Sequence, residues 1–205
     1  MPRNLRESKT PILVCVLALL ALLLLPACSV NVKKDERGQD KNVDIQTPVG
    51  GIHVSKDADV RDVGLPLYPG ARPKEKTGND GSSANVNMNW GPFGLKVIAI
   101  GFVTDDAADK VAAFYRDKLK SFGNILECHT DNGDPGDLDV NFGDKSDKGS
   151  QELKCGANNG KNLELKVGTK DNQHLVSIRP QESGAGTYFA LVYVRAHGDK
   201  DKDTI

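Results

Sequence analysis

The sequence predicts an α+β domain, a mostly antiparallel sheet with one main helix packed on one face and a β-hairpin extension at its N-terminus. Three observations predict this class. Apolar and polar residues alternate over several short segments, which is the period of a half-buried strand. Beyond the first 42 residues, one segment, residues 104–122, has an apolar stripe at helical spacing. The strand-like segments come in runs on both sides of that helix, whereas a parallel sheet alternates strands with helices.

The first 28 residues have the pattern of a secretory signal that ends at a lipid-attachment site. Basic side chains begin the chain, and residues 12–25 form an uncharged apolar run. The small residue Ala27 then precedes Cys28, which completes the order typical of such signals. The apolar run is shorter than the roughly 20 residues that a membrane span needs. We therefore predict a signal peptide at residues 1–27. The alternatives are an uncleaved anchor, or a plain signal peptide followed by a chance cysteine.

Residues 25–28 read Leu-Pro-Ala-Cys and resemble the bacterial lipobox, whose cysteine receives a diacylglyceryl group and becomes the mature N-terminus. The resemblance implies that Cys28 is lipidated and that the membrane is a partner through this lipid. Several acyl chains on one residue would anchor firmly, because each buried methylene contributes about 0.8 kcal/mol. Ser29 follows, and by analogy with lipoprotein sorting it favours the outer membrane in a cell that has one. The predicted location is the cell envelope, facing the periplasm or the outside.

Charge and length limit the remaining functions. The whole chain has a formal net charge of −1, and loss of the basic leader makes the rest slightly more acidic. Such a chain lacks the basic surface by which proteins bind nucleic acid, so no nucleic-acid partner is expected. The length suits one domain with a tail at each end. We expect a lipidated flexible tether at residues 28–42, because its polar composition offers nothing to bury. The domain follows at residues 43–195, and a charged tail at residues 196–205.

Residues 43–63 are expected to form a hairpin extension and a linker. Val43 and Ile45 alternate with polar residues before a turn that contains two glycines, and Ile52 and Val54 alternate after it. This pattern predicts a β-hairpin. The alternative is an ordered extension that packs on the main sheet.

Residues 84–90 predict a strand with one wet face, because apolar residues alternate strictly with Asn85, Asn87 and Asn89. The three asparagines are a candidate binding face, and the alternative is an ordinary solvated sheet face. Residues 95–103 are apolar on both faces, which predicts a central strand that is covered on both sides.

The main helix is expected to begin at Thr104. Its hydroxyl can cap free backbone N–H groups, and Asp105 and Asp106 suit the positive end of the helix dipole. Gly123 is expected to end the helix. The inward stripe consists of Ala108, Val111, Ala112, Tyr115, Leu119 and Phe122, with Phe114 beside it.

After the helix, strands are expected at residues 124–128, 151–155, 163–167, 174–179 and 187–194. The dipeptide Asn159-Gly160 is the strongest hairpin signal in the chain and should join the second and third of these strands. Alternation in the third strand predicts that Glu164 and Lys166 face solvent.

Two motifs carry a resemblance to a protein family. Residues 68–71 read Tyr-Pro-Gly-Ala, and Thr104-Asp105 begin a segment that continues through Val111 to Phe114-Tyr115. Together they resemble exported bacterial lipoproteins of unknown function that combine such a turn with such a helix. The resemblance covers residues 64–122. It implies export and structural roles for both motifs, and it implies no activity or catalytic residue.

Two cysteines remain beyond the leader and the lipidation site. An even pair in an exported domain favours a disulfide between Cys128 and Cys155. The bridge would stabilise the fold by roughly 3–4 kcal/mol in the chain-entropy model. The alternatives are two buried thiols, or a metal pair completed by His129, although metal sites usually need three or four ligands at tight spacing.

The other polar clusters give no catalytic, metal or cofactor site. The aspartate-rich loop at residues 131–147 invites a calcium interpretation, but its spacing does not match the helix-flanked calcium loop, and a solvated loop is the alternative we favour. His174 lies near Asp171, as a polar turn beside a strand often places such residues. The sequence contains no glycine–serine elbow and no glycine loop that would cradle phosphate.

These observations predict a lipid-anchored domain of the cell envelope that acts as a binding or interaction module, with an envelope protein as its partner. The alternative is a small envelope hydrolase or an accessory factor for envelope assembly. A cleft with converging polar groups would favour the enzyme, and an exposed apolar patch would favour the interaction module.

Overall fold

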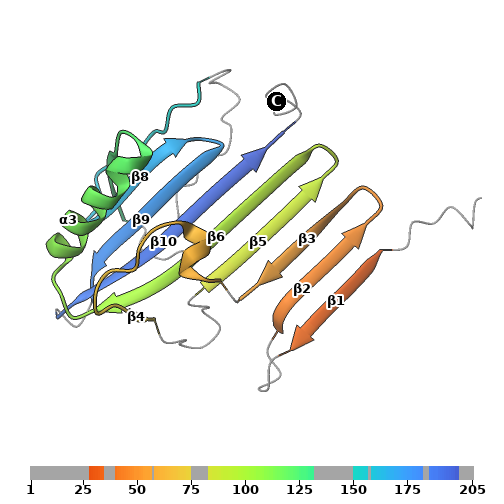
Figure 1. Cartoon of the computed structure of the whole chain (residues 1–205), viewed down its shortest axis with the longest axis horizontal. Coiled ribbons are helices and arrows are strands. Elements are labelled where there is room, and N and C mark those ends of the chain that lie inside the picture. Colours follow the sequence, from red (N-terminus) through yellow and green to blue (C-terminus); the bar gives the residue numbers. More distant parts are fainter. Residues whose placement is uncertain are drawn as a thin grey trace, which may run out of the picture.

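The computed structural model describes residues 28–34, 40–56, 58–74, 83–131, 150–156, 158–181 and 185–198. The predicted signal peptide, nearly all of the aspartate-rich loop and the end of the C-terminal tail lie outside these ranges. Within them, ten strands form one antiparallel sheet, and two α-helices lie against it (Figure 1). The predicted α+β class is confirmed at this level, in a fold that its sheet dominates.

Nine of the described strands cross the sheet in the order β1, β2, β3, β5, β6, β10, β9, β8 and β7. In that order they span Ser29–Lys34, Asp40–Thr47, Gly50–Ser55, Ser83–Trp90, Phe93–Thr104, Thr187–His197, Asn172–Pro180, Asn162–Thr169 and Leu126–Thr130. The short strand β4, Arg72–Pro73, pairs with β6 beyond the end of β5. Because β10 ends at His197, the first two residues of the predicted tail belong to the sheet.

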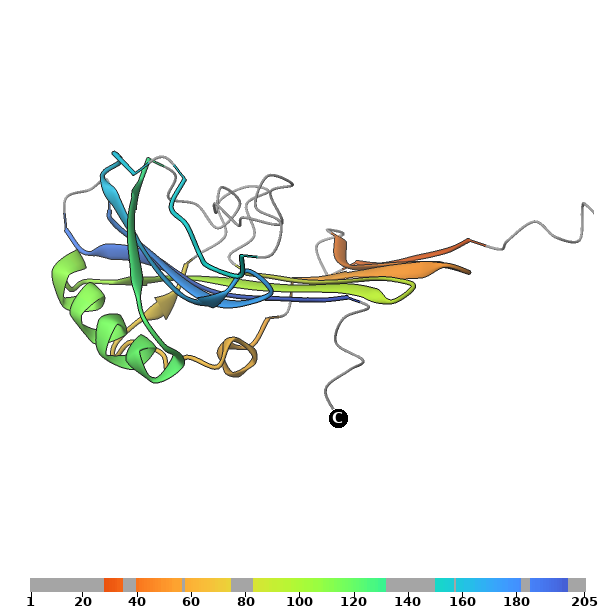
Figure 2. The same cartoon turned by 90° about the horizontal axis from the view of Figure 1, so that it is seen from above.

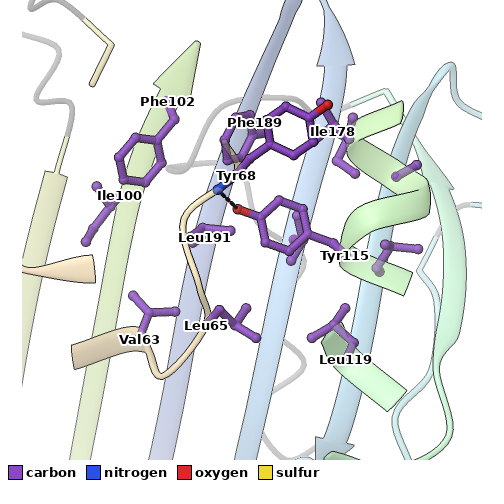
Figure 3. Close-up of a cluster of buried hydrophobic side chains, with 14 of the residues drawn as sticks. Val63, Leu65, Tyr68, Ile100, Phe102, Tyr115, Leu119, Ile178, Phe189 and Leu191 are labelled. Atoms are coloured by element: carbon purple, nitrogen blue, oxygen red, sulfur yellow. Dashed lines mark hydrogen bonds between the residues drawn. The ribbon is translucent and has the colours of Figure 1, made fainter. Parts of the chain in front are cut away.

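Helix α3, Ala108–Leu119, covers one face of the sheet across β8, β9 and β10. Val111, Tyr115 and Leu119 are fully buried, which confirms the predicted inward face along α3 (Figure 3). Phe122 does not belong to this face as predicted: it lies in the 3-10 turn after α3 and is 41 % exposed. A 3-10 turn continues the helix to Gly123, whose φ of 134° favours glycine. The helix therefore supplies a large part of the apolar cover on this side.

Helix α3 begins four residues later than the sequence predicts. Thr104 is the last residue of β6 and pairs with Thr187 of β10, so its backbone is held in the sheet. Its hydroxyl accepts a long hydrogen bond of 3.4 Å from the Asp106 N–H. Ala107 occupies the N-cap position and contributes no side-chain hydrogen bond. The prediction of a threonine cap is wrong because the strand continues further than its apolar run.

The two motifs that carry the family resemblance lie against each other. In the turn, Gly70 has a φ of 73° and the Ala71 N–H donates to the Tyr68 carbonyl at 3.1 Å, as expected with proline second and glycine third. The Tyr115 hydroxyl of α3 accepts a hydrogen bond from the Tyr68 N–H at 3.1 Å and donates to the Pro66 carbonyl at 3.2 Å (Figure 3). The helix thus holds this loop on the core.

The short helix α2, Val60–Val63, lies where the sequence predicts a linker. The Asp59 side chain accepts a hydrogen bond from the Arg61 N–H at 2.9 Å and caps its start. Gly64, with a φ of 75°, ends it. Figure 2 shows that α2 and α3 lie on the same side of the sheet.

The prediction of a flexible tether is wrong for most of the described residues in that segment. Ser29–Lys34 form β1 and Asp40 begins β2, with Val30 opposite Ile45 in their pairing. Two valines alternating with polar residues suffice to add a strand at the sheet edge, although charged residues surround them. Strands β2 and β3 form the predicted hairpin, and β3 pairs with β5. We call β1, β2, β3 and β5 the sheet extension.

The predicted hairpin around Asn159-Gly160 is also wrong. Residues 151–155 form no strand, and β8 pairs with β7 and β9 instead. The Gly160 N–H donates to the His129 carbonyl at 3.0 Å. A Cβ at Gly160 would lie 1.8 Å from the carbonyl carbon of Thr130. This glycine therefore allows close approach to the end of β7, rather than a turn between two paired strands.

Candidate functional site

One face of the sheet extension is apolar from its edge to the centre of the sheet. The strand register places one row of residues across six strands: Val30, Ile45, Ile52, Met88, Leu95 and Ala196. The next row contains Val32, Val43, Val54, Val86, Val97 and Val194. Directly paired residues of an antiparallel sheet share a face. The two rows therefore form one surface, roughly 24 Å wide at about 4.8 Å per strand, which we call the apolar face.

Cover on the apolar face changes along the sheet. Its inner end is closed, because Leu175, Val192 and Val194 are buried. Its outer end is open: Ile52 is 39 % exposed, and no described helix lies over it, since α2 and α3 are on the other side (Figure 2). The same residue pattern is thus core at one end and surface at the other.

A shallow groove of about 490 Å³ follows the outer part of the apolar face. Its apolar lining comes from β2, β3, β5, β6 and β10, and includes Ile45, Ile52, Met88, Trp90, Phe93, Leu95 and Ala196. This volume lies within the range of small-molecule sites, but the groove is an open surface rather than a cleft with converging polar groups. Its chemistry favours contact with another apolar surface.

The asparagines predicted as a binding face lie on the opposite face of the extension. The Asn87 side-chain amide donates to the Asn85 carbonyl oxygen at 2.9 Å. Asp44 and His53 lie beside them across the strand register, with 3.9 Å between carboxylate and imidazole. This face has its own shallow hollow of about 420 Å³, lined in part by Asn87 and Asn89. A binding role for Asn85, Asn87 and Asn89 stays a prediction.

Cys28, the predicted lipidation site, is exposed and directly precedes β1. Ser29 pairs with Gln46 at the end of the sheet where the β2–β3 turn lies. The β5–β6 turn lies at the same end, because Gly50 of β3 pairs with Trp90 of β5. Cys28 therefore lies at the same end of the sheet as both turns.

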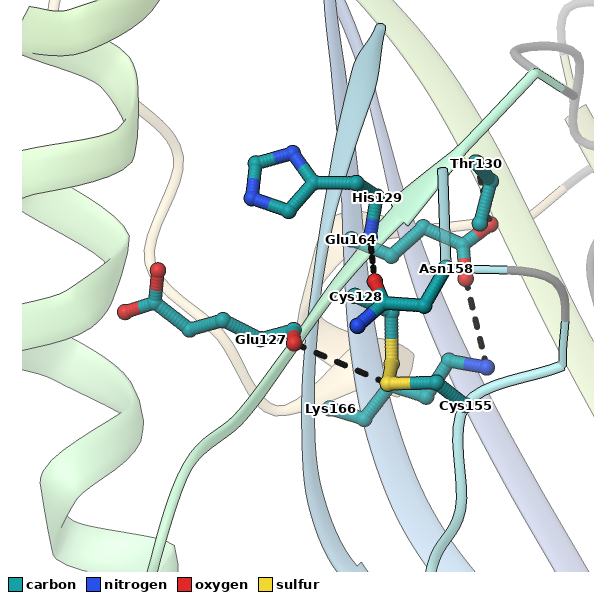
Figure 4. The surroundings of a disulfide bond; sticks show 8 residues. All are labelled: Glu127, Cys128, His129, Thr130, Cys155, Asn158, Glu164 and Lys166. Carbon is teal, nitrogen blue, oxygen red and sulfur yellow. Dashed lines mark hydrogen bonds and ion pairs between the residues drawn. A yellow bond between two sulfur atoms is a disulfide. The ribbon is translucent and has the colours of Figure 1, made fainter. Parts of the chain in front are cut away.

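The predicted disulfide between Cys128 and Cys155 is present, with 5.5 Å between the two Cα atoms. It ties residues 151–155 to β7, on the side of the sheet away from α3 (Figure 4). The Lys170 N–H also donates to the Gln151 carbonyl at 3.1 Å. This segment helps to close the inner part of the sheet where α3 cannot reach.

Glu164 and Lys166 do not face solvent as predicted. Both are 1 % exposed, and the lysine Nζ lies 3.2 Å from a glutamate oxygen beside the disulfide (Figure 4). They alternate with Leu165 as expected, but the disulfide-linked segment covers their face. A buried ion pair is costly to break, because the remaining charge would be unpaired. It is a structural feature of the core that strand alternation alone could not reveal.

His174 is packed between two aromatic rings. Its ring lies 4.3 Å from the Phe122 ring centre and 4.9 Å from that of Tyr193. Burial lowers the pKa of His174, and a backbone hydrogen bond with Val63 partly offsets this shift. The neutral ring is therefore favoured, as suits a residue packed between aromatic rings.

Metal ligands are not clustered in the part of the chain that the structure describes, where no three His, Cys, Asp or Glu side chains converge. Of the aspartate-rich loop at residues 131–147, only Asp131 is described, so the calcium interpretation falls outside the structure. None of the helices formed by the described residues is long and apolar enough to cross a membrane.

No protein-family model, curated protein or solved structure matches the chain.

Proposed function

We propose that this protein is a lipid-anchored interaction module of the cell envelope, which binds a protein partner through the apolar face of its sheet extension. The observation that carries the proposal is the open outer end of that face, where Val30 and Ile52 remain exposed. Full burial of an aliphatic side chain contributes about 1.5–3 kcal/mol. A partner that covers this face would bury these side chains, and their burial would stabilise the complex.

The edge of the sheet favours a protein as the partner. β1 is the outermost strand, and no described strand pairs with its outer side. The N–H and C=O groups of an edge strand can pair with a strand from another chain. Val30 and Val32 of β1 belong to the apolar face as well as to this edge. A protein strand can therefore contact both the edge and the apolar face.

The anchor is proposed at Cys28, on the basis of the leader pattern and the exposed position of this cysteine. Ser29 already belongs to β1, so an anchored lipid would hold the extension close to the membrane. Tethering raises the local concentration of a binding surface and strengthens contacts that would be weak in solution. Cys28→Ser should abolish labelling by fatty acid, and a labelled mutant would contradict the anchor.

Cross-linking in the native envelope tests the binding surface. Ile52→Lys places a charge on the apolar face, whereas Asn87→Lys places the same charge on the opposite face of the neighbouring strand. We expect the Ile52→Lys variant to form no cross-link with the partner. The Asn87→Lys variant should form the same cross-link as the unchanged protein. Ile52→Thr is a milder variant that retains a β-branched side chain suited to the strand, and it should weaken the cross-link.

Circular dichroism and the intact disulfide serve as controls that each variant is folded. Unchanged cross-linking of the folded Ile52→Lys protein would contradict the proposal. Loss of the partner by Asn87→Lys alone would assign binding to the face of Asn85, Asn87 and Asn89 instead.

A further inference from the structure

We infer that the end of the sheet beside Cys28 is a second membrane contact, in which Trp90 and Phe93 enter the interface between lipid and water. The contact consists of the β2–β3 turn and the β5–β6 turn, residues 47–51 and 89–95, which we call the tip. This inference rests on the membrane location in the proposed function. It adds a surface that binds lipid directly, without the covalent anchor.

The tip lies at the same end of the sheet as the predicted lipid. The chain enters β1 from Cys28, and both turns lie at this end, as Figures 1 and 2 show from two directions. The register agrees, because Ser29 pairs with Gln46, close to the β2–β3 turn, and Gly50 pairs with Trp90 at the β5–β6 turn. A bilayer that holds the acyl chains of Cys28 would therefore lie next to both turns.

Exposed apolar side chains concentrate at this end. Among the described residues, four large apolar side chains are more than half exposed: Trp90 at 71 %, Val30 at 62 %, and Val49 and Phe93 at 59 % each. Val49 and the two aromatic residues lie in or beside the two turns, and Val30 is the second residue of β1. Neither turn segment, 47–51 or 89–95, contains a charged residue. This combination is unusual for a turn that faces only water.

The chemistry of the tip suits the membrane interface. Tryptophan is enriched at the level of the lipid head groups, where its ring is partly apolar and its N–H stays hydrated. Behind the tip, on the face opposite the apolar face, Lys96 of β6 pairs with Arg195 of β10 in the strand register. Long basic side chains can reach head groups while the residues ahead of them enter the apolar layer. The tip thus has an apolar front with basic side chains behind it.

A second contact would fix the orientation of the domain. A lipid on Cys28 alone holds the chain at one point and leaves the sheet free to rotate. Insertion of both turns would direct the strands away from the membrane. Apart from Leu95, which belongs to the tip, the apolar face would then stand clear of the bilayer and remain open to a protein partner.

The sole tryptophan of the chain provides the test, because Trp90 lies in the tip. Because β1 begins at Ser29, the unlipidated chain that starts there retains every described strand and helix. Its fluorescence is recorded with vesicles of phosphatidylethanolamine and phosphatidylglycerol. We expect the emission to shift to shorter wavelength, and brominated acyl chains to quench it.

Matched variants assign the signal to the tip. Val49→Ser with Phe93→Ser should lower the vesicle partition coefficient at least about tenfold, because two exposed apolar side chains no longer enter lipid. Leu67→Ser is the control: this residue is also exposed, but it lies in the loop on the helix side of the sheet. It should bind like the unchanged protein.

Three results would overturn the inference: no spectral shift with vesicles, equal binding by the tip variant and the control, or the same shift at high protein concentration without lipid, which would indicate self-association. Mass spectrometry of the protein purified from its envelope tests the anchor separately. An unmodified Cys28 with vesicle binding intact would remove the lipid anchor and leave the tip contact standing.

Discussion

The helix-covered part of the sheet and the sheet extension are built from the same alternating strands, yet their apolar residues end in different surroundings. Strand β6 passes through both. Its residues Ile98, Ile100 and Phe102 are buried in the core beneath the helix side of the sheet. Toward the tip, Leu95 and Val97 of the same strand are only partly buried, on a face that no described helix covers.

The comparison shows that alternation determines which residues share a face but not whether that face is covered. In the covered part, α3 closes one side and the disulfide-linked residues 151–155 help to close the other. In the extension, the described chain supplies no second layer to either face. We interpret the difference as a division of roles, with one part holding the fold together and the other offering a surface.

The largest expected effect separates two aliphatic residues from the two parts. Leu119 of α3 is fully buried, and Leu119→Ala should lower the free energy of unfolding by roughly 2–5 kcal/mol through the lost contacts and the cavity left behind. Ile52→Ala in the extension should cost under about 1 kcal/mol, because the side chain is already partly in water. Urea unfolding measures both. Equal losses would mean that the extension is as much a part of the core as α3.

Removal of the disulfide should have the next largest effect. The bridge closes 27 residues of chain, so Cys128→Ala with Cys155→Ala should lose roughly 3–4 kcal/mol in the chain-entropy model. The cover over Glu164 and Lys166 should also loosen. Unfolding of the unchanged protein with and without reductant provides the comparison. Coincident curves would show that the segment at residues 151–155 adds little to the covered part.

A smaller effect is expected where α3 holds the loop that precedes β4. Tyr115→Phe removes the acceptor of the Tyr68 N–H, which lies in the core, at a cost of about 1–3 kcal/mol. Tyr68→Phe is the matched control, because its hydroxyl bonds to Asp106 near the surface and should cost less. The order of the two midpoints in a thermal melt checks this expectation. A lower midpoint for Tyr68→Phe than for Tyr115→Phe would show that the hydrogen bond to Asp106, rather than the bonds of Tyr115, contributes more to holding this loop.

The smallest expected effect is a pH dependence from His174. Burial lowers its pKa in the folded state, so the unfolded chain takes up the proton first as the pH falls. The stability contributed by the neutral ring is complete above the unfolded pKa of about 6.5 and is lost as the pH falls below it. His174→Gln should flatten the stability curve between about pH 7.5 and 5.5. Parallel curves for both proteins would rule out this contribution.

Much of the covered fold could be predicted from local pattern. The inward residues of α3, the central strand β6 and the turn at residues 68–71 follow from helical spacing, a two-sided apolar run and a Pro-Gly pair. The cysteine pair followed from counting in an exported chain. Each of these signals is contained within a short segment or in one simple pairing.

Features that depend on distant contacts could not be predicted in the same way. Gly160 is required by the approach of β7, and Thr104 is held in β6 by its partner on β10. Glu164 and Lys166 are buried because a segment tied down by the disulfide lies over them. In each case the local sequence pattern was correctly identified, but a contact with a distant segment determined the structure that these residues adopt.

The apolar face of the sheet extension could be predicted only in part. The alternation of Val30 and Val32 was visible in the sequence, yet the charged residues around them favoured a tether. Only the strand register aligns these valines with those of β2, β3 and β5 in one continuous face. The sequence instead predicted the asparagines on the opposite face of β5 as the binding face. Alternation within one strand identifies a polar row, but it does not show whether the apolar row is covered by another segment.

Hydroxyl-radical footprinting of the protein in its native envelope and after purification tests the central claim most directly. If the apolar face is a contact surface, Ile52 and Met88 should be oxidised in the purified protein and protected in the envelope. Leu67 and Phe122, which are exposed on other parts of the molecule, should react in both states. Equal oxidation of Ile52 and Met88 in both states would contradict the claim that this face is covered by a partner.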